Sequence, residues 1–416
     1  MKFGTNELFV ASVAALLGTQ AFGDNLREAV VRDSAIRAGL VPAAETVVQT
    51  DDALVAVGKE LFESKLLSSS EDTACASCHL DRFGSADGIP VALGTDASGA
   101  GLDRIVGGGD IIPRNTLPFW GRGGKGFTTF FSDGRVDASV TPLISQFGEM
   151  PPSEDPLIVA IHLPPVEIGE MVLDASSADD LQTETLQSAI KIYDLVARRV
   201  QEDSELSSRL SAARSVPVDD LTYLDVASAI ANFIRFNFAL KDTKFHRFVF
   251  SGGDLTDEEL NGALLFYGRG RCSSCHNGPY FSDLEFHAIP FPQFGSGKNG
   301  FGVDYGRYNV TMNPADLFTF RTPPLFNVSK TAPYSHSGSV ASLQEAIRYH
   351  VDPLAHFDAS MSANDRAQYY QRLTFWAETG LSGVVLSDAD YADIESFLGT
   401  LSFESELQVK EVDLVD

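Results

Sequence analysis

Basic residues are scarce in this chain. Its 31 lysines and arginines are outnumbered by 57 aspartates and glutamates, which gives a formal net charge of −26. A protein this acidic does not bind nucleic acid or an anionic membrane surface through bulk charge. It favours basic or neutral partners, unless the charge simply reflects a habitat rich in salt.

Long apolar runs are missing as well. The longest candidate, at residues 8–17, has about ten residues, whereas a membrane span needs about 20. It follows Lys2 and precedes the small-residue segment AFG at 21–23, which is the pattern of a secretory signal peptide. We therefore expect residues 1–23 to be a signal peptide, the protein to be exported to the periplasm, and no helix to span a membrane. A buried N-terminal helix is the alternative.

Cysteine is the third scarcity, with four residues in the whole chain. All four lie in two motifs of one form, CASCH from Cys75 and CSSCH from Cys272. C-x-x-C-H is the attachment signature of a c-type haem, because two sulfurs on one short turn can reach two vinyl groups of one porphyrin. Two CxxC redox or disulfide pairs and a zinc site are the alternatives, and the large separation of the pairs disfavours zinc.

The residue after each cysteine pair completes the motif. His79 follows Cys78, and His276 follows Cys275. Each imidazole is then placed to bind the iron of its own haem as the proximal ligand. We expect two covalently bound c-type haems.

A similar helical pattern precedes both motifs. DDALVAVGKELFESKLL covers residues 51–67, and DLTDEELNGALLFYGRG covers 254–270, where a capping box opens at Thr256. A helix that leads into a haem loop is the core unit of a cytochrome c domain, and the length of the chain favours two domains. We expect a mainly α protein of two cytochrome c-like haem domains, at 24–245 and 246–416, with long loops and little strand.

Four longer segments resemble the bacterial di-haem cytochrome c peroxidase and MauG family. They are PRNTLPFW at 113–120, FFSDGRVD at 130–137, FGEM at 147–150 and FRTPPLFNVSKTAPYSHSGSVASLQEAI at 320–347. The resemblance implies that the haem of the N-terminal domain meets hydrogen peroxide, and that the haem of the C-terminal domain relays or stores electrons.

The same resemblance implies a calcium ion between the domains. By position, its ligands are Asn115 and the backbone carbonyls of Thr331 and Pro333. A loop asparagine that caps its own backbone is the alternative for Asn115.

The family pattern points to Glu149, in FGEM, as the catalytic acid–base, with Arg135 as a supporting residue or propionate partner. A solvated loop glutamate and a surface arginine are the alternatives. No histidine or methionine lies at residues 80–148, and the place of the peroxidases' distal histidine falls near Thr95. We therefore expect an open first haem, as in the MauG branch, unless a distant histidine such as His162 folds back.

Two positions depart from the family pattern. The family often has a tryptophan between the haems, and here that position is Ser132. Trp120 could serve from a nearby segment. The glutamine that precedes the catalytic glutamate in the family is replaced by Ser139.

The second axial ligand of the C-terminal haem is methionine in the peroxidases and tyrosine in MauG. Counting from TAPYSHSG puts this position on His350. The helical spacing i, i+3, i+4, i+7 joins His350 to the apolar residues Leu343, Ala346 and Ile347, whereas Tyr349 lies off that stripe. We expect His350 to bind the iron, with Tyr349 as the alternative.

Together these features predict a periplasmic di-haem oxidoreductase that reacts with hydrogen peroxide. The electrons would come from a protein substrate, as in MauG, or from a small cytochrome c or cupredoxin. The open first haem and the second ligand other than methionine slightly favour the MauG-like reaction. A di-haem electron carrier or redox sensor without turnover is the alternative of another class.

Overall fold

The computed structural model describes residues 25–148, 150–172, 185–300, 302–356 and 363–410. These residues are mainly helical, and their strands form only short antiparallel pairs. No helix among the described residues has both the length and the apolar character that crossing a bilayer requires. The expected fold class, mainly α with long loops and little strand, is confirmed.

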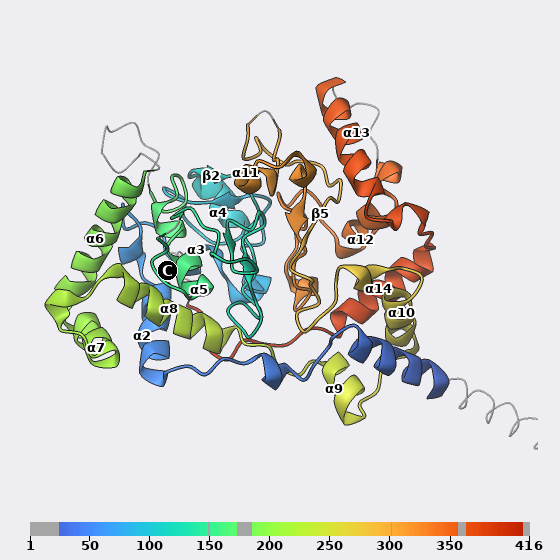
Figure 1. Ribbon diagram of the computed structural model, residues 1–416, viewed down its shortest axis with the longest axis horizontal. Helices are drawn as coiled ribbons and strands as arrows, with labels where there is room; N and C mark the ends of the chain where they lie inside the picture. Colours follow the sequence, from blue (N-terminus) through green and yellow to red (C-terminus); the bar gives the residue numbers. More distant parts are fainter. Residues whose placement is uncertain (1–24, 149, 173–184, 301, 357–362, 411–416) are drawn as a thin grey trace, which may run out of the picture.

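A helix at residues 25–37 precedes the labelled elements of Figure 1. The further α-helices are α2 Asp52–Phe62, α3 Cys75–Cys78, α4 Leu102–Gly107, α5 Pro156–Ile161, α6 Leu186–Glu202, α7 Ser204–Arg214, α8 Tyr223–Asn237, α9 Lys244–Ser251, α10 Asp257–Tyr267, α11 Tyr308–Thr311, α12 Leu343–Val351, α13 Ala363–Ala377 and α14 Asp388–Gly399. The strand pairs are β1 Ala92–Leu93 with β2 Ile111–Ile112, β3 Thr129–Phe130 with β4 Val136–Asp137, and β5 Phe286–His287 with β6 Phe320–Arg321.

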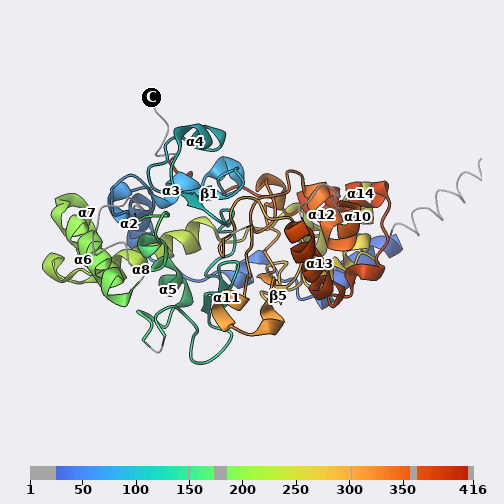
Figure 2. The ribbon, with the colours of Figure 1, turned by 90° about the horizontal axis from the view of Figure 1, so that it is seen from above.

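The helices gather at the two ends of the molecule. Seen from above, α2 and α6–α8 lie at one end and α10 and α12–α14 at the other, with the loop-rich middle between them (Figure 2). The helices expected before each CxxCH motif are α2 and α10, and the capping box of Thr256 and Glu259 is present on α10.

Both halves use a helical glycine to bring two helices close together. A Cβ at Gly58 of α2 would lie 2.0 Å from the carbonyl oxygen of Ala229 on α8, and a Cβ at Gly262 of α10 would lie 1.9 Å from that of Asp393 on α14. No side chain fits at such a distance, so glycine permits the close crossing. The repeat expected from the sequence is therefore present in the packing as well.

The two ends of the chain each reach the opposite half. The helix at 25–37 packs beside α9 and α10 (Figure 1), where the Arg32 guanidinium lies 3.8 Å from the ring centre of Phe248. At the other end, the Leu407 and Val409 N–H groups donate to Asn237 and Asp81, at 2.7 Å in both cases. The domain boundary between 24–245 and 246–416 stays a prediction. Each end of the chain packs against the half that lies on the other side of this boundary.

Candidate functional site: two cavities and their walls

The first CxxCH motif forms one wall of a cavity in the N-terminal half, called the N-terminal cavity below. Cys75, Cys78 and His79 all line it. The cysteines occupy the short helix α3, and the His79 Nδ1 lies 2.9 Å from the carbonyl oxygen of Ser85. Nδ1 is thereby used as the donor, which leaves Nε2 free for a metal.

The second motif lines the C-terminal cavity in the same way. Cys272, Cys275, His276 and His350 are all on its wall. The His276 Nδ1 lies 3.0 Å from the carbonyl oxygen of Phe281, and the His350 Nδ1 lies 2.8 Å from that of Ala346 on its own helix. All three predicted iron ligands thus have Nδ1 bound to a backbone carbonyl and Nε2 left over.

The spacing of His276 and His350 fits a shared iron. Their ring centres are 6.2 Å apart with an interplanar angle of 57°. A metal–imidazole bond is about 2 Å, and the ring centre lies roughly 1 Å behind the nitrogen, so two imidazoles on one metal have centres roughly 6 Å apart. Burial lowers the pKa of both histidines, that of His276 to about 4, which favours the neutral form that binds metals.

Helix α12 turns the predicted stripe toward this cavity. Leu343, Ala346, Ile347 and His350 all line the C-terminal cavity, and Tyr349 does not. The Tyr349 ring packs instead beside Phe291, with ring centres 5.5 Å apart. The helical period alone therefore separates the two candidate ligands.

A glutamate that sequence reasoning missed lies in the N-terminal cavity. Glu149 falls outside the described residues, so its role as acid–base stays a prediction. Glu167 and Glu170 both line the cavity. Burial and the negative charge of Glu167 together raise the pKa of Glu170 to about 7, against the opposing effect of the cations Arg135 and Lys298.

The sequence did carry a signal for Glu170. The triplet Gly-Glu-Met occurs twice, at 148–150 and at 169–171. Met150 is 77% exposed, whereas Met171 is 3% exposed and lines the cavity together with Glu170. The second triplet therefore belongs to the wall of the site.

Backbone contacts hold the turn that carries Glu170. Thr95 N donates to the carbonyl oxygen of Gly169 at 3.0 Å, and a Cβ at Gly94 would lie only 1.8 Å from that same oxygen. Gly169 itself has φ of +81°, which favours glycine. Thr95 stands near the place expected for a distal histidine. It holds the turn of Glu170 through its backbone N–H and does not line the cavity.

The alternative of a returning histidine can be examined at His162. This residue is 3% exposed, and its ring packs against Tyr193 and Tyr223 with centres 5.3 and 4.9 Å away. It does not line the N-terminal cavity, where His79 is the one histidine among the described lining residues. Met171 is the methionine on that wall, and it belongs to the hydrophobic core.

Two buried arginines line the cavities. Arg122 lines the N-terminal cavity and Arg321 the C-terminal one, and among the described residues neither forms an ion pair. Burial lowers the pKa of both guanidiniums. A buried cation is costly unless an anion pairs with it, and haem propionates are anions. With the cysteines, the Nε2 atoms and the apolar walls, these residues fit two bound haems.

Arg135 is not on the surface. Its side chain is 14% exposed and pairs with Asp133 at 3.2 Å and with Glu167 at 3.1 Å. Of the two roles predicted for Arg135, these contacts fit a supporting residue of the site better than a partner of a haem propionate.

The residues predicted to bind calcium lie close together. The Asn115 Nδ2 donates to the carbonyl oxygen of Pro333 at 2.7 Å, while its Oδ1 is buried without a hydrogen-bond partner. Turning the amide would bring Oδ1 beside the Pro333 oxygen, a pair of the oxygen ligands that calcium prefers. Thr331 and Pro333 line the C-terminal cavity, and Asn115 lines both cavities.

A short stretch separates the two cavities. Asn115, Thr116, Leu117 and Ser132 each line both of them. Ser132 therefore occupies the intervening position expected of it. Trp120 lines neither cavity, and its indole N–H donates to the carbonyl oxygen of Gly84 at 2.7 Å, so the described geometry gives no role to Trp120 between the haems.

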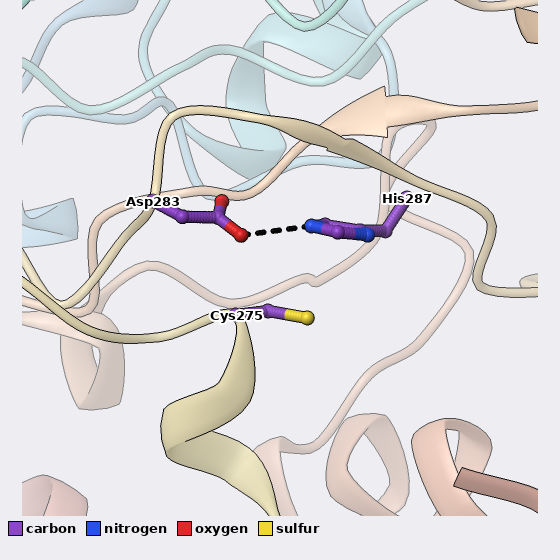
Figure 3. Close-up of side chains that lie close together, drawn as sticks. All are labelled: Cys275, Asp283 and His287. Carbon is purple, nitrogen blue, oxygen red and sulfur yellow. Dashed lines mark hydrogen bonds and ion pairs between the residues drawn. The ribbon is translucent and has the colours of Figure 1, made fainter. Parts of the chain in front are cut away.

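Cys275, Asp283 and His287 form a cluster beside the second motif (Figure 3). The His287 Nε2 lies 2.8 Å from Asp283 Oδ2, and this hydrogen bond, together with the contact to Cys275, raises the pKa of His287 to about 10. The three side chains could hold a metal ion only if the sulfur were free. A thioether to haem would use that sulfur, so the cluster fits the surroundings of a second haem better than a separate metal site.

Two sulfurs and a histidine on each of two cavity walls fit a protein that holds two c-type haems. A family model described as "Di-haem cytochrome c peroxidase" matches residues 52–254. The chain belongs to the di-haem cytochrome c peroxidase and MauG family, and its class is that of a peroxidase-type oxidoreductase. Its two CxxCH motifs are consistent with two c-type haems, and hydrogen peroxide is the substrate that the family implies.

Relatives fall in both branches of the family. Cytochrome-c peroxidase IdrP2 of Denitromonas iodatirespirans is 23% identical over 71% of this chain and 73% of its own length. Methylamine utilization protein MauG of Methylorubrum extorquens is 26% identical over 71% and 68%. Cytochrome c peroxidase Ccp of Escherichia coli is 24% identical over 72% and 53%.

Solved structures share the fold. A MauG-like protein associated with microbial copper homeostasis superposes with a TM-score of 0.62 and 21% identity, over 88% of this chain and 92% of that one. The diheme peroxidase BthA from Burkholderia thailandensis gives a TM-score of 0.59 and 19% identity, over 88% and 89%.

Proposed function

We propose that this protein reacts with hydrogen peroxide at the N-terminal haem and uses the oxidising equivalents to modify a protein substrate, as MauG does. The reduction of peroxide with electrons from a small cytochrome c or cupredoxin is the second candidate. A bound haem supplies an iron at which the O–O bond of peroxide can be cleaved and from which electrons can be drawn.

One observation carries the proposal, the contrast between the two cavities. In the C-terminal cavity a second histidine faces His276 at the spacing of a shared iron. In the N-terminal cavity His79 has no histidine opposite it among the described lining residues, and a buried carboxyl group is on the wall instead. This contrast supports one closed and one open haem.

Glu170 is our candidate for the proton-transfer group. Moving a proton from one peroxide oxygen to the other needs a side chain that can both accept and donate a proton near neutral pH. A carboxyl group with a pKa of about 7 meets that condition. Its place on the wall of the open cavity favours Glu170, and the role of Glu149 remains open.

The ligand set of the second haem favours protein oxidation over the peroxidase reaction. Two imidazoles give a lower reduction potential than histidine with methionine, because methionine favours reduced iron. A low-potential haem suits the stabilisation of a high oxidation state shared by the pair. It suits less well the storage of an electron from a high-potential donor.

We further propose a calcium ion at Asn115, Thr331 and Pro333, and a periplasmic location. The orphaned Oδ1 of Asn115 beside the Pro333 carbonyl supports the first. The signal-like pattern of residues 1–23 supports the second.

Electron paramagnetic resonance of the oxidised, haem-loaded protein tests the site. We expect one high-spin and one low-spin ferric haem, and two low-spin signals would overturn the open site. Adding peroxide to the fully oxidised protein separates the two reactions. An optical change without prior reduction supports the MauG-like reaction, whereas a reaction of only the half-reduced form supports the conventional peroxidase.

A further inference from the structure

Two carboxylates share the wall of the N-terminal cavity on one tight turn. The carbonyl oxygen of Glu167 accepts hydrogen bonds from the N–H groups of Glu170, Met171 and Val172, each at 3.2 Å. This triple contact fixes the backbone of Glu167 relative to that of Glu170. Both carboxyl groups line the same cavity, and the charge of Glu167 acts on the Glu170 carboxyl.

Two cations from different parts of the chain hold Glu167. The Arg135 NH1 lies 3.1 Å from Glu167 Oε2, and the Lys298 Nζ lies 3.6 Å from Glu167 Oε1. Arg135 follows the FFSDG segment of the N-terminal half, whereas Lys298 comes from a loop of the C-terminal half, where Gly297 packs tightly against Val303. Each oxygen of Glu167 thus has its own cation.

A chain of ion pairs extends from Arg135 to Arg114, and both arginines line the N-terminal cavity. Asp133 bridges Arg135 at 3.2 Å and Arg114 at 2.6 Å, and Arg114 also contacts Asp304 at 2.7 Å. Arg114 is therefore neutralised by two carboxylates, and Arg135 by Asp133 and Glu167.

We propose that Glu167 is a positioning residue whose negative charge keeps the neighbouring Glu170 protonated, and that its ion-pair partner Lys298, a lysine of the C-terminal half, opposes this effect. The inference rests on the proposed function of Glu170. Its physical basis is that two carboxylates in one buried site resist ionising together.

The other groups around Glu170 leave this role to Glu167. The charged or titratable residues on the same wall are Arg114, Arg122, Arg135 and Tyr223, and Cys75, Cys78 and His79 are taken by the haem. Of the charged residues that act on the Glu170 carboxyl, Glu167 raises its pKa, and Arg135 and Lys298 lower it. The two partners of the Glu167–Lys298 pair therefore act on Glu170 in opposite directions.

This opposition provides the test. In the haem-loaded protein, Glu167→Gln should move the protonation midpoint of Glu170 to lower pH by about one unit, and Lys298→Met should move it to higher pH by a similar amount. The midpoint is read from the carboxyl band in infrared difference spectra, which Glu170→Gln should abolish. Lys125→Met, which removes a cation from an exposed side chain, should leave the midpoint unchanged.

If the Glu167–Lys298 ion pair only supported the structure, removing either partner would disturb the site in the same way. The protonation midpoint of Glu170 would then shift in the same direction in both variants. Shifts of the same sign, no shift, or no band that Glu170→Gln removes would overturn the inference. The pH dependence of the reaction with peroxide is measured in parallel. If Glu170→Gln keeps full reactivity while the opposite infrared shifts are present, the proposed catalytic function is wrong and the electrostatic inference stands.

Discussion

Replacing Glu170 by glutamine should stabilise the haem-loaded protein in alkaline solution and change its stability little in acid. Burial and the charge of Glu167 raise the pKa of Glu170 from 4.5 to about 7. A folded-state pKa above the unfolded value means that the folded protein holds this proton more tightly. The resulting stability is fully present below about pH 4.5 and is lost as the pH rises through about 7.

The size of the effect follows from the shift. One pKa unit corresponds to about 1.4 kcal/mol, so a rise from 4.5 to about 7 corresponds to about 3 kcal/mol between acid and alkaline solution. Glutamine is neutral at every pH and resembles the protonated acid in shape. The variant should therefore exceed the wild type by about 3 kcal/mol at pH 8 and match it near pH 4.

Urea unfolding at the two pH values, followed by circular dichroism, measures this difference. Glu202→Gln, at an exposed position on α6, is the matched control and should give the same difference at both pH values. A difference for Glu170→Gln that does not change with pH would refute the reasoning. So would a wild type that gains stability over the variant as the pH rises.

Three further predictions concern the ligands and the packing. His350→Ala should turn the second haem high-spin in electron paramagnetic resonance while Tyr349→Phe leaves it low-spin, and the reverse pattern would reassign the ligand. Asn115→Ala should abolish calcium binding in metal analysis and calorimetry while Asn115→Asp retains it, since only the aspartate keeps the side-chain oxygen; equal binding by both would remove Asn115 from the site. Gly262→Ala should destabilise the protein by about 2 kcal/mol or more in urea unfolding, because its Cβ would meet the Asp393 backbone, whereas Gly399→Ala, with open space around it, should be nearly neutral.

The parts of the site that follow from local spacing could be predicted from the sequence. The CxxCH motifs need only one turn of chain to place two sulfurs and an imidazole. The orientation of His350 needs only the period of a helix, since Leu343 and Ile347 share its face. In both cases a few neighbouring residues determine the geometry, so the sequence pattern is enough to predict it.

Glu170 could not be predicted in the same way, because a distant contact decides its position. The two Gly-Glu-Met triplets have the same sequence, so the sequence alone does not distinguish them. The second lies in the cavity because Gly94 lets the β1 segment approach the carbonyl oxygen of Gly169, and because Thr95 N donates to that oxygen. The packing of the C-terminal segment is another long-range feature, since Leu407 and Val409 bond to Asn237 and Asp81, which lie far away in the sequence.

The repeated unit of the fold determines only one side of each haem site. The close helix crossings at Gly58 and Gly262 and the CxxCH turns are equivalent in the two halves, and each gives a histidine with Nε2 free. The opposite side is built from unrelated segments. In the C-terminal half, α12 supplies His350, and in the N-terminal half the turn after α5 supplies Glu170. The proposed difference between a closed and an open haem therefore lies in these two added segments, and we expect a change in either one to alter the chemistry without disturbing the unit that attaches the haem.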